Sequence, residues 1–105
     1  MIKKGGINVS PAEVEDALMR HPAVALAGVV GVPDPVQGER LAAFVVAKPG
    51  ASPTPEELTQ HCRGFLSRYK VPDAIELRDA LPATPTGKLM RRELKRLAAG
   101  VGRGR

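Results

Sequence analysis

The sequence holds one cysteine, no tryptophan, one tyrosine and two phenylalanines among its 105 residues. The single cysteine, Cys62, cannot form a disulfide within the chain, which fits a protein kept in a reducing compartment. So few aromatic rings also give little surface on which nucleic-acid bases could stack. The composition therefore excludes a disulfide-stabilised fold and argues against a stacking platform for single-stranded nucleic acid.

Long hydrophobic runs are missing as well. The longest apolar stretches, AVALAGVVGV and LAAFVVA, are far shorter than the roughly 20 residues that span a bilayer. The amino-terminal MIKKGG lacks the apolar segment of a secretory signal peptide. We therefore expect a cytoplasmic protein without a membrane span.

The chain is basic overall, with a formal net charge of +5 at pH 7. Much of this charge lies between Lys88 and the carboxyl terminus, where Glu93 is the only acidic residue. A solvated helix face followed by a basic tail accounts for the pattern, and a phosphate-bearing partner is the alternative. Because aromatic residues are scarce, we expect no nucleic-acid partner, although a small basic nucleic-acid-binding domain stays open at this point.

The chain length fits one domain with its own core. Gly5 and Gly6 can supply the two positive-φ positions of a tight hairpin turn. Segments 23–32 and 41–47 are apolar without polar alternation, as expected of strands buried on both faces. The predicted elements are a hairpin at 1–9, helices starting at 10, 54 and 88, and strands at 23–32, 41–47 and 71–77.

Two of the helix starts share one signature. Ser10 and Thr54 each precede a proline and have a glutamate three residues later, Glu13 and Glu57, which is the pattern of a capping box. Helical spacing then predicts an apolar stripe facing the core on each of the last two helices. The residues on these stripes are Leu58, Cys62, Phe65, Leu66 and Tyr69, and then Met90, Leu94 and Leu97.

These elements predict an α+β fold: an N-terminal β-hairpin followed by a small, three-stranded sheet packed with helices. The domain is expected to cover residues 1–98. The glycine-rich end, GVGRGR, predicts a disordered basic tail at 99–105.

Lys88 lies in the pliable loop PATPTGKL, directly before the basic helix. The loop is not a Walker motif, because Pro82 replaces its first glycine and Leu89 replaces its metal-binding hydroxyl. A cation at a helix start is mildly disfavoured by the helix dipole, so helix stability does not explain the lysine. A long-stemmed ammonium can reach and stabilise a developing negative charge. Lys88 is therefore a candidate catalytic residue, with an ordinary surface lysine as the alternative.

Other chemistry-bearing residues favour structural roles. His21, at the end of the first helix, can cap helix carbonyls, and no acidic spacing joins it to His61 as a metal site. Cys62 is expected in the core. The glutamates near helix starts fit capping and dipole roles better than an acid–base pair; they are Glu13, Glu15, Glu56 and Glu57.

Four stretches stand in a shared order: IKKGGINVSPAEVEDAL, GVPDPVQGERLAAFVV, YKVPDAIEL and LPATPTGKLMRREL. Together they resemble the small C-terminal domain of the adenylate-forming enzymes, which include acyl-CoA synthetases, luciferases and peptide-synthetase adenylation domains. The resemblance covers about residues 2–95. It is closest to the acyl-CoA synthetases.

The resemblance implies a two-step reaction. A carboxylate attacks the α-phosphate of ATP, and a thiol, usually that of coenzyme A, then displaces AMP from the acyl-adenylate. It implies that Lys88 contacts carboxylate and phosphate oxygens in the first step, after which the domain rotates and presents its hairpin for the second. The residues expected to face ATP or coenzyme A are Lys3, Gly5, Gly6, Asn8 and Gly87.

The large N-terminal domain of that family is absent from this sequence. The resemblance places the ATP phosphate loop, the acyl pocket and the Mg²⁺ that accompanies ATP in that domain, outside this chain. We therefore expect a large adenylation domain as partner, covalent or separate, and a small-molecule carboxylate, ATP and coenzyme A as ligands. A noncatalytic module for ligand sensing or dimerisation is the alternative.

Overall fold

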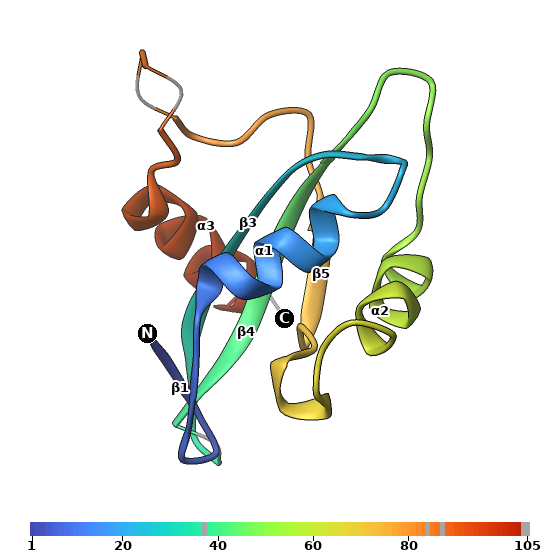
Figure 1. Ribbon diagram of the computed structural model, residues 1–105. Coiled ribbons are helices and arrows are strands. Elements are labelled where there is room, and N and C mark those ends of the chain that lie inside the picture. Colours follow the sequence, from blue (N-terminus) through green and yellow to red (C-terminus); the bar gives the residue numbers. More distant parts are fainter. Residues whose placement is uncertain (37, 84, 87, 104–105) are drawn as a thin grey trace.

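The computed structural model describes residues 1–36, 38–83, 85–86 and 88–103. Figure 1 shows helices packed on both faces of a twisted sheet. The elements in chain order are β1 (Ile2–Lys4), β2 (Ile7–Val9), α1 (Pro11–Met19), β3 (Val24–Asp34), β4 (Gly38–Ala47), α2 (Pro55–Arg63), the 3₁₀ helix η1 (Arg68–Lys70), β5 (Ala74–Leu77) and α3 (Arg91–Arg103).

The predicted hairpin and three-stranded sheet form one five-stranded sheet of order β2-β1-β4-β3, with β5 also paired to β4. β3 and β4 make a long antiparallel ladder, whereas β5 runs parallel to β4. β4 is long enough to pair with β1 through Gly38 and with β5 through residues 42–45. The α+β prediction is confirmed, and the hairpin extends the predicted sheet instead of standing apart from it.

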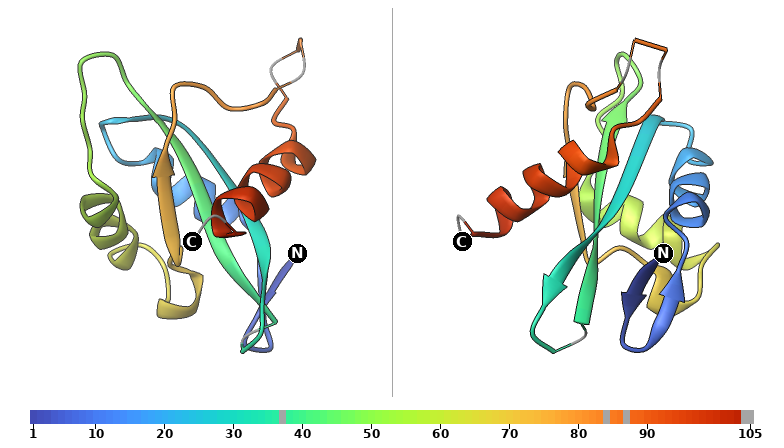
Figure 2. Two further views of the ribbon diagram at one scale, coloured as in Figure 1. Left: turned by 180° about the vertical axis from the view of Figure 1, so that it is seen from behind. Right: turned by 90° about the vertical axis from the view of Figure 1, so that its left-hand side faces the viewer.

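Two apolar layers hold the helices to the sheet. α1 and α2 cover one face and α3 covers the other, as the two views of Figure 2 show. Alternate residues of β3 supply both layers: Val29 belongs to the α1 and α2 side, and Val30 to the α3 side. This arrangement explains why β3 and β4 read as near-continuous apolar runs in the sequence.

Capping at the two predicted boxes differs. The Thr54 hydroxyl accepts a hydrogen bond from the Glu57 N–H at 3.1 Å, which confirms the cap of α2. Ser10 makes no side-chain capping bond, so this part of the prediction is wrong. Glu13 instead lies 3.0 Å from the Lys70 ammonium, and this long-range ion pair takes the carboxylate that a capping box would use.

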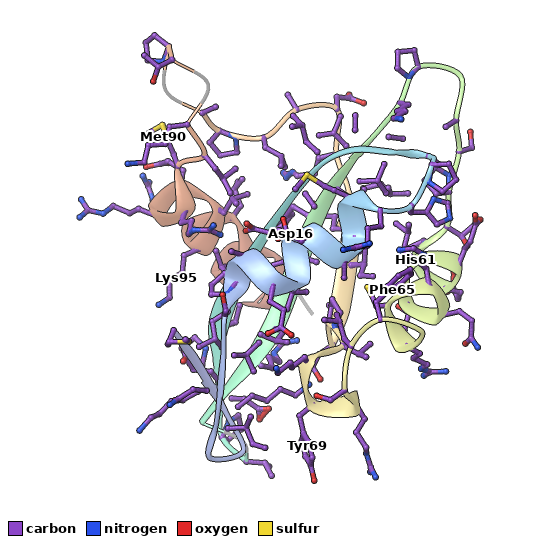
Figure 3. The ribbon with its side chains drawn as sticks, in the orientation of Figure 1. Asp16, His61, Phe65, Tyr69, Met90 and Lys95 are labelled. Atoms are coloured by element: carbon purple, nitrogen blue, oxygen red, sulfur yellow. The ribbon has the colours of Figure 1, made fainter. Side chains whose placement is uncertain are left out.

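The stripe predicted for α2 is confirmed at Leu58, Cys62 and Leu66, which lie in or against the core, and is wrong at Phe65 and Tyr69. α2 ends at Arg63, and Phe65 and Tyr69 are 54% and 48% exposed. Helical spacing places residues on one face only while the helix lasts. Phe65 lies against the His61 ring, with centroids 4.9 Å apart, while Tyr69 projects from the body (Figure 3).

The carboxyl-terminal elements also shift. β5 begins at Ala74, since Pro72 has no N–H to donate to a ladder. α3 begins at Arg91, so Met90 is 38% exposed, while Leu89 packs against the core in its place. The helix continues to Arg103, past the predicted boundary at 98, because a glycine costs a helix only about 1 kcal/mol.

Candidate functional site

Lys88 lies on a loop whose base is closed by backbone contacts. Ala83 and Leu89 form an antiparallel bridge across the loop, and the Met90 N–H donates to the Pro82 carbonyl at 2.9 Å. The residue itself is exposed. Gly87, predicted to face a ligand beside it, lies outside the described residues. Lys88 is thus presented to solvent from an anchored base.

A glycine on β3 makes room for the anchor of this loop. A Cβ atom at Gly28 would lie 2.5 Å from Leu94 Cδ1, closer than atoms pack, and 3.2 Å from Leu89 Cδ2, which is a tight contact. Leu94 is fully buried and Leu89 packs against the same cluster. The neighbour of Lys88 therefore rests directly on the backbone of β3. Nothing in the local sequence around Gly28 signals this contact, because its partners are far along the chain.

Three residues after Lys88, a charged junction joins α3 to α1 and β3. Arg91 donates to both carboxylate oxygens of Glu15, with Nη2 to Oε1 at 2.9 Å, and Nη1 also reaches the Val29 carbonyl at 3.2 Å. The Val29 N–H donates to Glu15 Oε2 at 2.8 Å. Glu15 is 7% exposed, so the capping role predicted for it is wrong: it is a buried anchor.

The same junction acts on the protonation of Arg91. The hydrogen bond to Glu15 raises the pKa of the guanidinium above its already high value; burial opposes this and the charge of Glu15 adds to it. Arg91 therefore stays a cation, and its bidentate contact has the fork geometry that arginine and carboxylate prefer.

The hairpin confirms its predicted turn. Gly5 and Gly6 have φ of +58° and +82°, and a Cβ at either would meet no atom within 4 Å. Their backbone is thus open to a ligand. Lys3 and Asn8 are exposed and lie opposite each other in the β1–β2 ladder. The structure brings these four predicted residues together, whereas Lys88 lies elsewhere.

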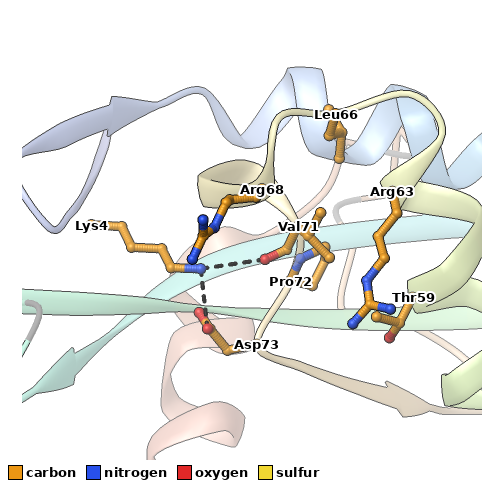
Figure 4. A pocket seen from close by; sticks show the side chains of 8 residues that line it. All are labelled: Lys4, Thr59, Arg63, Leu66, Arg68, Val71, Pro72 and Asp73. Atoms are coloured by element: carbon orange, nitrogen blue, oxygen red, sulfur yellow. Dashed lines mark hydrogen bonds and ion pairs between the residues drawn. The ribbon is translucent and has the colours of Figure 1, made fainter.

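An ion pair between the buried Lys4 and the partly exposed Asp73 ties this hairpin to the body. The Lys4 ammonium, in a residue only 6% exposed, lies 3.0 Å from Asp73 Oδ1 and donates to the Val71 carbonyl at 3.4 Å (Figure 4). Asp73 Oδ2 in turn accepts from the Leu41 N–H at 2.7 Å. The pair borders an open cavity of about 530 Å³, lined by Lys4, Thr59, Arg63, Leu66, Arg68, Val71, Pro72 and Asp73. Sequence reasoning missed this pair.

Histidines and the cysteine stay structural. The His21 ring accepts from the Ala23 N–H through Nδ1 at 3.1 Å and pairs with Glu57 through Nε2 at 3.1 Å. The backbone N–H of His21, not its ring, caps α1 by donating to the Leu18 carbonyl at 3.1 Å. His61 Nε2 lies 2.7 Å from the Ala17 carbonyl. Cys62 is fully buried as predicted, and burial raises the pKa of its thiol to about 11. Over the described ranges, no helix reaches the length and apolarity of a membrane span, and no group of three acidic, histidine or cysteine side chains could hold a metal ion.

The lysine loop and the glycine hairpin lie at opposite ends of the molecule. Figures 1 and 2 show the loop between β5 and α3 at one end and the β1–β2 turn at the other. The longest dimension of the molecule is 38 Å. A single active site on a partner domain therefore cannot contact both the lysine loop and the glycine hairpin in one orientation of this domain.

Comparison with known proteins identifies this layout. The family model for the AMP-binding enzyme C-terminal domain matches residues 13–88, which include Lys88. The chain belongs to this family.

Relatives of this AMP-binding C-terminal domain are ligases. The long-chain-fatty-acid–CoA ligase of Bacillus subtilis is 49% identical over 94 residues, which are 90% of this chain and 17% of the relative. The 2-succinylbenzoate–CoA ligase of Geobacillus kaustophilus is 50% identical over 97 residues, 92% of this chain and 20% of the relative.

Solved structures agree with the family assignment. The acyl-CoA synthetase of Brucella canis superposes with a TM-score of 0.88 at 41% identity, covering 99% of this chain and 19% of that one. The predicted likeness to the small domain of adenylate-forming enzymes is confirmed. This AMP-binding C-terminal domain spans about a fifth of the length of the relatives it matches.

Proposed function

We propose that this chain is the mobile C-terminal catalytic domain of an AMP-forming acyl-CoA synthetase. The observation that supports this most is the placement of the segment between β5 and α3, which carries Lys88, and of the β1–β2 turn at opposite ends of a domain of this family (Figure 1). A two-step reaction can use each end in turn if the domain reorients between steps. The partner is a large N-terminal adenylation domain that brings the ATP and acyl sites and the Mg²⁺ that accompanies ATP.

In the first step, a carboxylate oxygen attacks the α-phosphate and pyrophosphate leaves. Negative charge accumulates on the phosphate oxygens as the new bond forms. Lys88, exposed on its anchored loop, enters the site and offsets that charge while orienting the carboxylate.

In the second step, the sulfur of coenzyme A attacks the acyl carbonyl and AMP leaves. The Gly5–Gly6 turn lets the thiol arm of coenzyme A run close to the backbone, because no side chain stands there. Lys3 and Asn8, side by side on the outer face of the hairpin, then face the adenylate. Gly87 is proposed to give Lys88 its freedom to enter and leave.

The acyl group lies outside this proposal. The B. subtilis and G. kaustophilus relatives act on a long-chain fatty acid and on 2-succinylbenzoate, yet both are nearly equally similar to this chain. The substrate class is therefore a carboxylic acid whose selecting pocket belongs to the large domain. The proposed location is the cytoplasm, where ATP and coenzyme A are available.

Lys88→Ala in the full-length ligase tests the proposal. Removing one preorganised electrostatic contact slows such a step by about 10²–10³-fold. We expect this loss in adenylation, measured by exchange of labelled pyrophosphate into ATP, with thioester formation from supplied acyl-adenylate preserved. Unchanged adenylation would reject the role of Lys88.

A further inference from the structure

The ion pair of Glu15 with Arg91 lies three residues after Lys88 in the chain. Arg91 is the first residue of α3, and its guanidinium grips Glu15 on α1 together with the Val29 carbonyl on β3. Leu89, between Lys88 and Arg91, packs against the same side of the molecule as Leu94. The chain that leaves Lys88 is thus fixed to two other elements within one short segment.

Helix docking alone does not call for this junction. Leu94 and Ala98 are buried and already hold α3 on the sheet. A cation in the first turn of a helix opposes the helix dipole. Burying a carboxylate such as Glu15 is also costly, and an apolar pair of similar volume often serves stability as well. An ion pair with three hydrogen bonds does, however, hold Arg91 in one defined position.

We infer that Glu15 and Arg91 are positioning residues that set the place of Lys88 in the adenylating active site. The inference rests on the proposed role of Lys88. Arg91 touches neither the substrate nor ATP in this account; it acts by fixing the carboxyl end of the lysine loop, while the Ala83–Leu89 bridge fixes the base. A misplacement of about 1 Å can cost a reaction on the order of 100-fold.

The experiment uses the full-length ligase that carries this domain, with both half-reactions measured separately. Arg91→Met removes the guanidinium and keeps much of the stem. We expect the kcat of adenylation to fall about 10- to 100-fold, with thioester formation from supplied acyl-adenylate within about twofold of the parent. Arg91→Lys keeps the charge without the fork, so it should recover part of the loss.

Arg96→Met is the matched control. Arg96 lies on the same helix, its side chain is 75% exposed, and it pairs with Glu93 one turn earlier. The control removes the same charge from α3 without touching α1 or β3. We expect both half-reactions to keep their rates.

A double variant shows whether Arg91 acts through Lys88. If it does, Lys88→Ala/Arg91→Met is no slower in adenylation than Lys88→Ala alone, because the lysine to be positioned is already gone. A double variant whose slowing is the product of the two single-variant effects would overturn the inference. An equal loss of both half-reactions in Arg91→Met would overturn it as well. Should Arg91→Met not fold, Glu15→Gln keeps the acceptor for Val29 and weakens only the grip on Arg91, and the same split is expected.

The variants distinguish a failure of the role proposed for Lys88 from a failure of the positioning role of Arg91. If Lys88→Ala leaves adenylation intact, the proposed function of Lys88 fails. If Lys88→Ala slows adenylation while Arg91→Met and Glu15→Gln do not, the positioning inference alone fails.

Discussion

Gly28→Ala gives the sharpest test of how the lysine loop is anchored. The added Cβ would lie 2.5 Å from Leu94 Cδ1, whereas carbon atoms prefer about 3.5–4.0 Å. Leu94 is fully buried, so the clash is relieved only by a strained rotamer of Leu94 against its packed neighbours or by a shift of α3 away from the sheet. Overpacking of this kind costs about 1–3 kcal/mol. Gly28 does not have a positive φ, so alanine recovers about 0.4–1 kcal/mol by restricting the unfolded chain.

Together, the two effects should lower the free energy of unfolding of Gly28→Ala by about 1–2 kcal/mol, measured by urea titration. Gly64→Ala is the matched control: its φ is −81° and its Cβ would meet only the His61 carbonyl at 3.4 Å. That variant should be neutral or slightly stabilised. In a Leu94→Ala background most of the cost at Gly28 should disappear, because the closest clashing methyl is gone and only the 3.2 Å contact with Leu89 remains. A Gly28→Ala chain as stable as the parent would refute the reasoning.

Two further predictions concern the other anchored groups. Asp73→Asn leaves the buried Lys4 ammonium without its carboxylate, so we expect the free energy of unfolding to fall by about 1–3 kcal/mol. We also expect a larger fall in thioester formation than in adenylation, and unchanged unfolding in urea would contradict this prediction. The raised pKa of Cys62, about 11, means that the unfolded chain loses the thiol proton first, so stability should fall as pH rises from about 9 to 11, by on the order of 2–3 kcal/mol. Cys62→Ala should flatten that part of the pH profile, and an equally steep fall in the variant would contradict it.

Local chemistry predicted much of this domain. The Gly5–Gly6 turn, the Thr54 cap and the buried strands each depend on a few neighbouring residues, and all three are confirmed. Lys88 became a candidate in the same way, because a lysine at the predicted helix start has no stability reason to be there; α3 begins three residues later, at Arg91, and the catalytic role of Lys88 stays a prediction.

Contacts between distant segments could not be predicted in that way. Glu15 looked like one of several helix-start glutamates, and only the fold brings it to Arg91. Lys4 and Asp73 are likewise joined by the pairing of β1 and β5 with one edge of β4. The prediction that Phe65 faces the core was wrong for the converse reason, because it extended the helical spacing past the end of α2. The ion pairs that hold the lysine loop and the glycine hairpin in place could therefore be found only from the structure.

The comparison of both half-reactions in Lys88→Ala tests the central claim most directly. The full-length ligase is assayed for pyrophosphate exchange and, separately, for thioester formation from supplied acyl-adenylate. The account predicts adenylation about 10²–10³-fold slower with the second step intact. Equal loss of both steps, or no loss of the first, would contradict it.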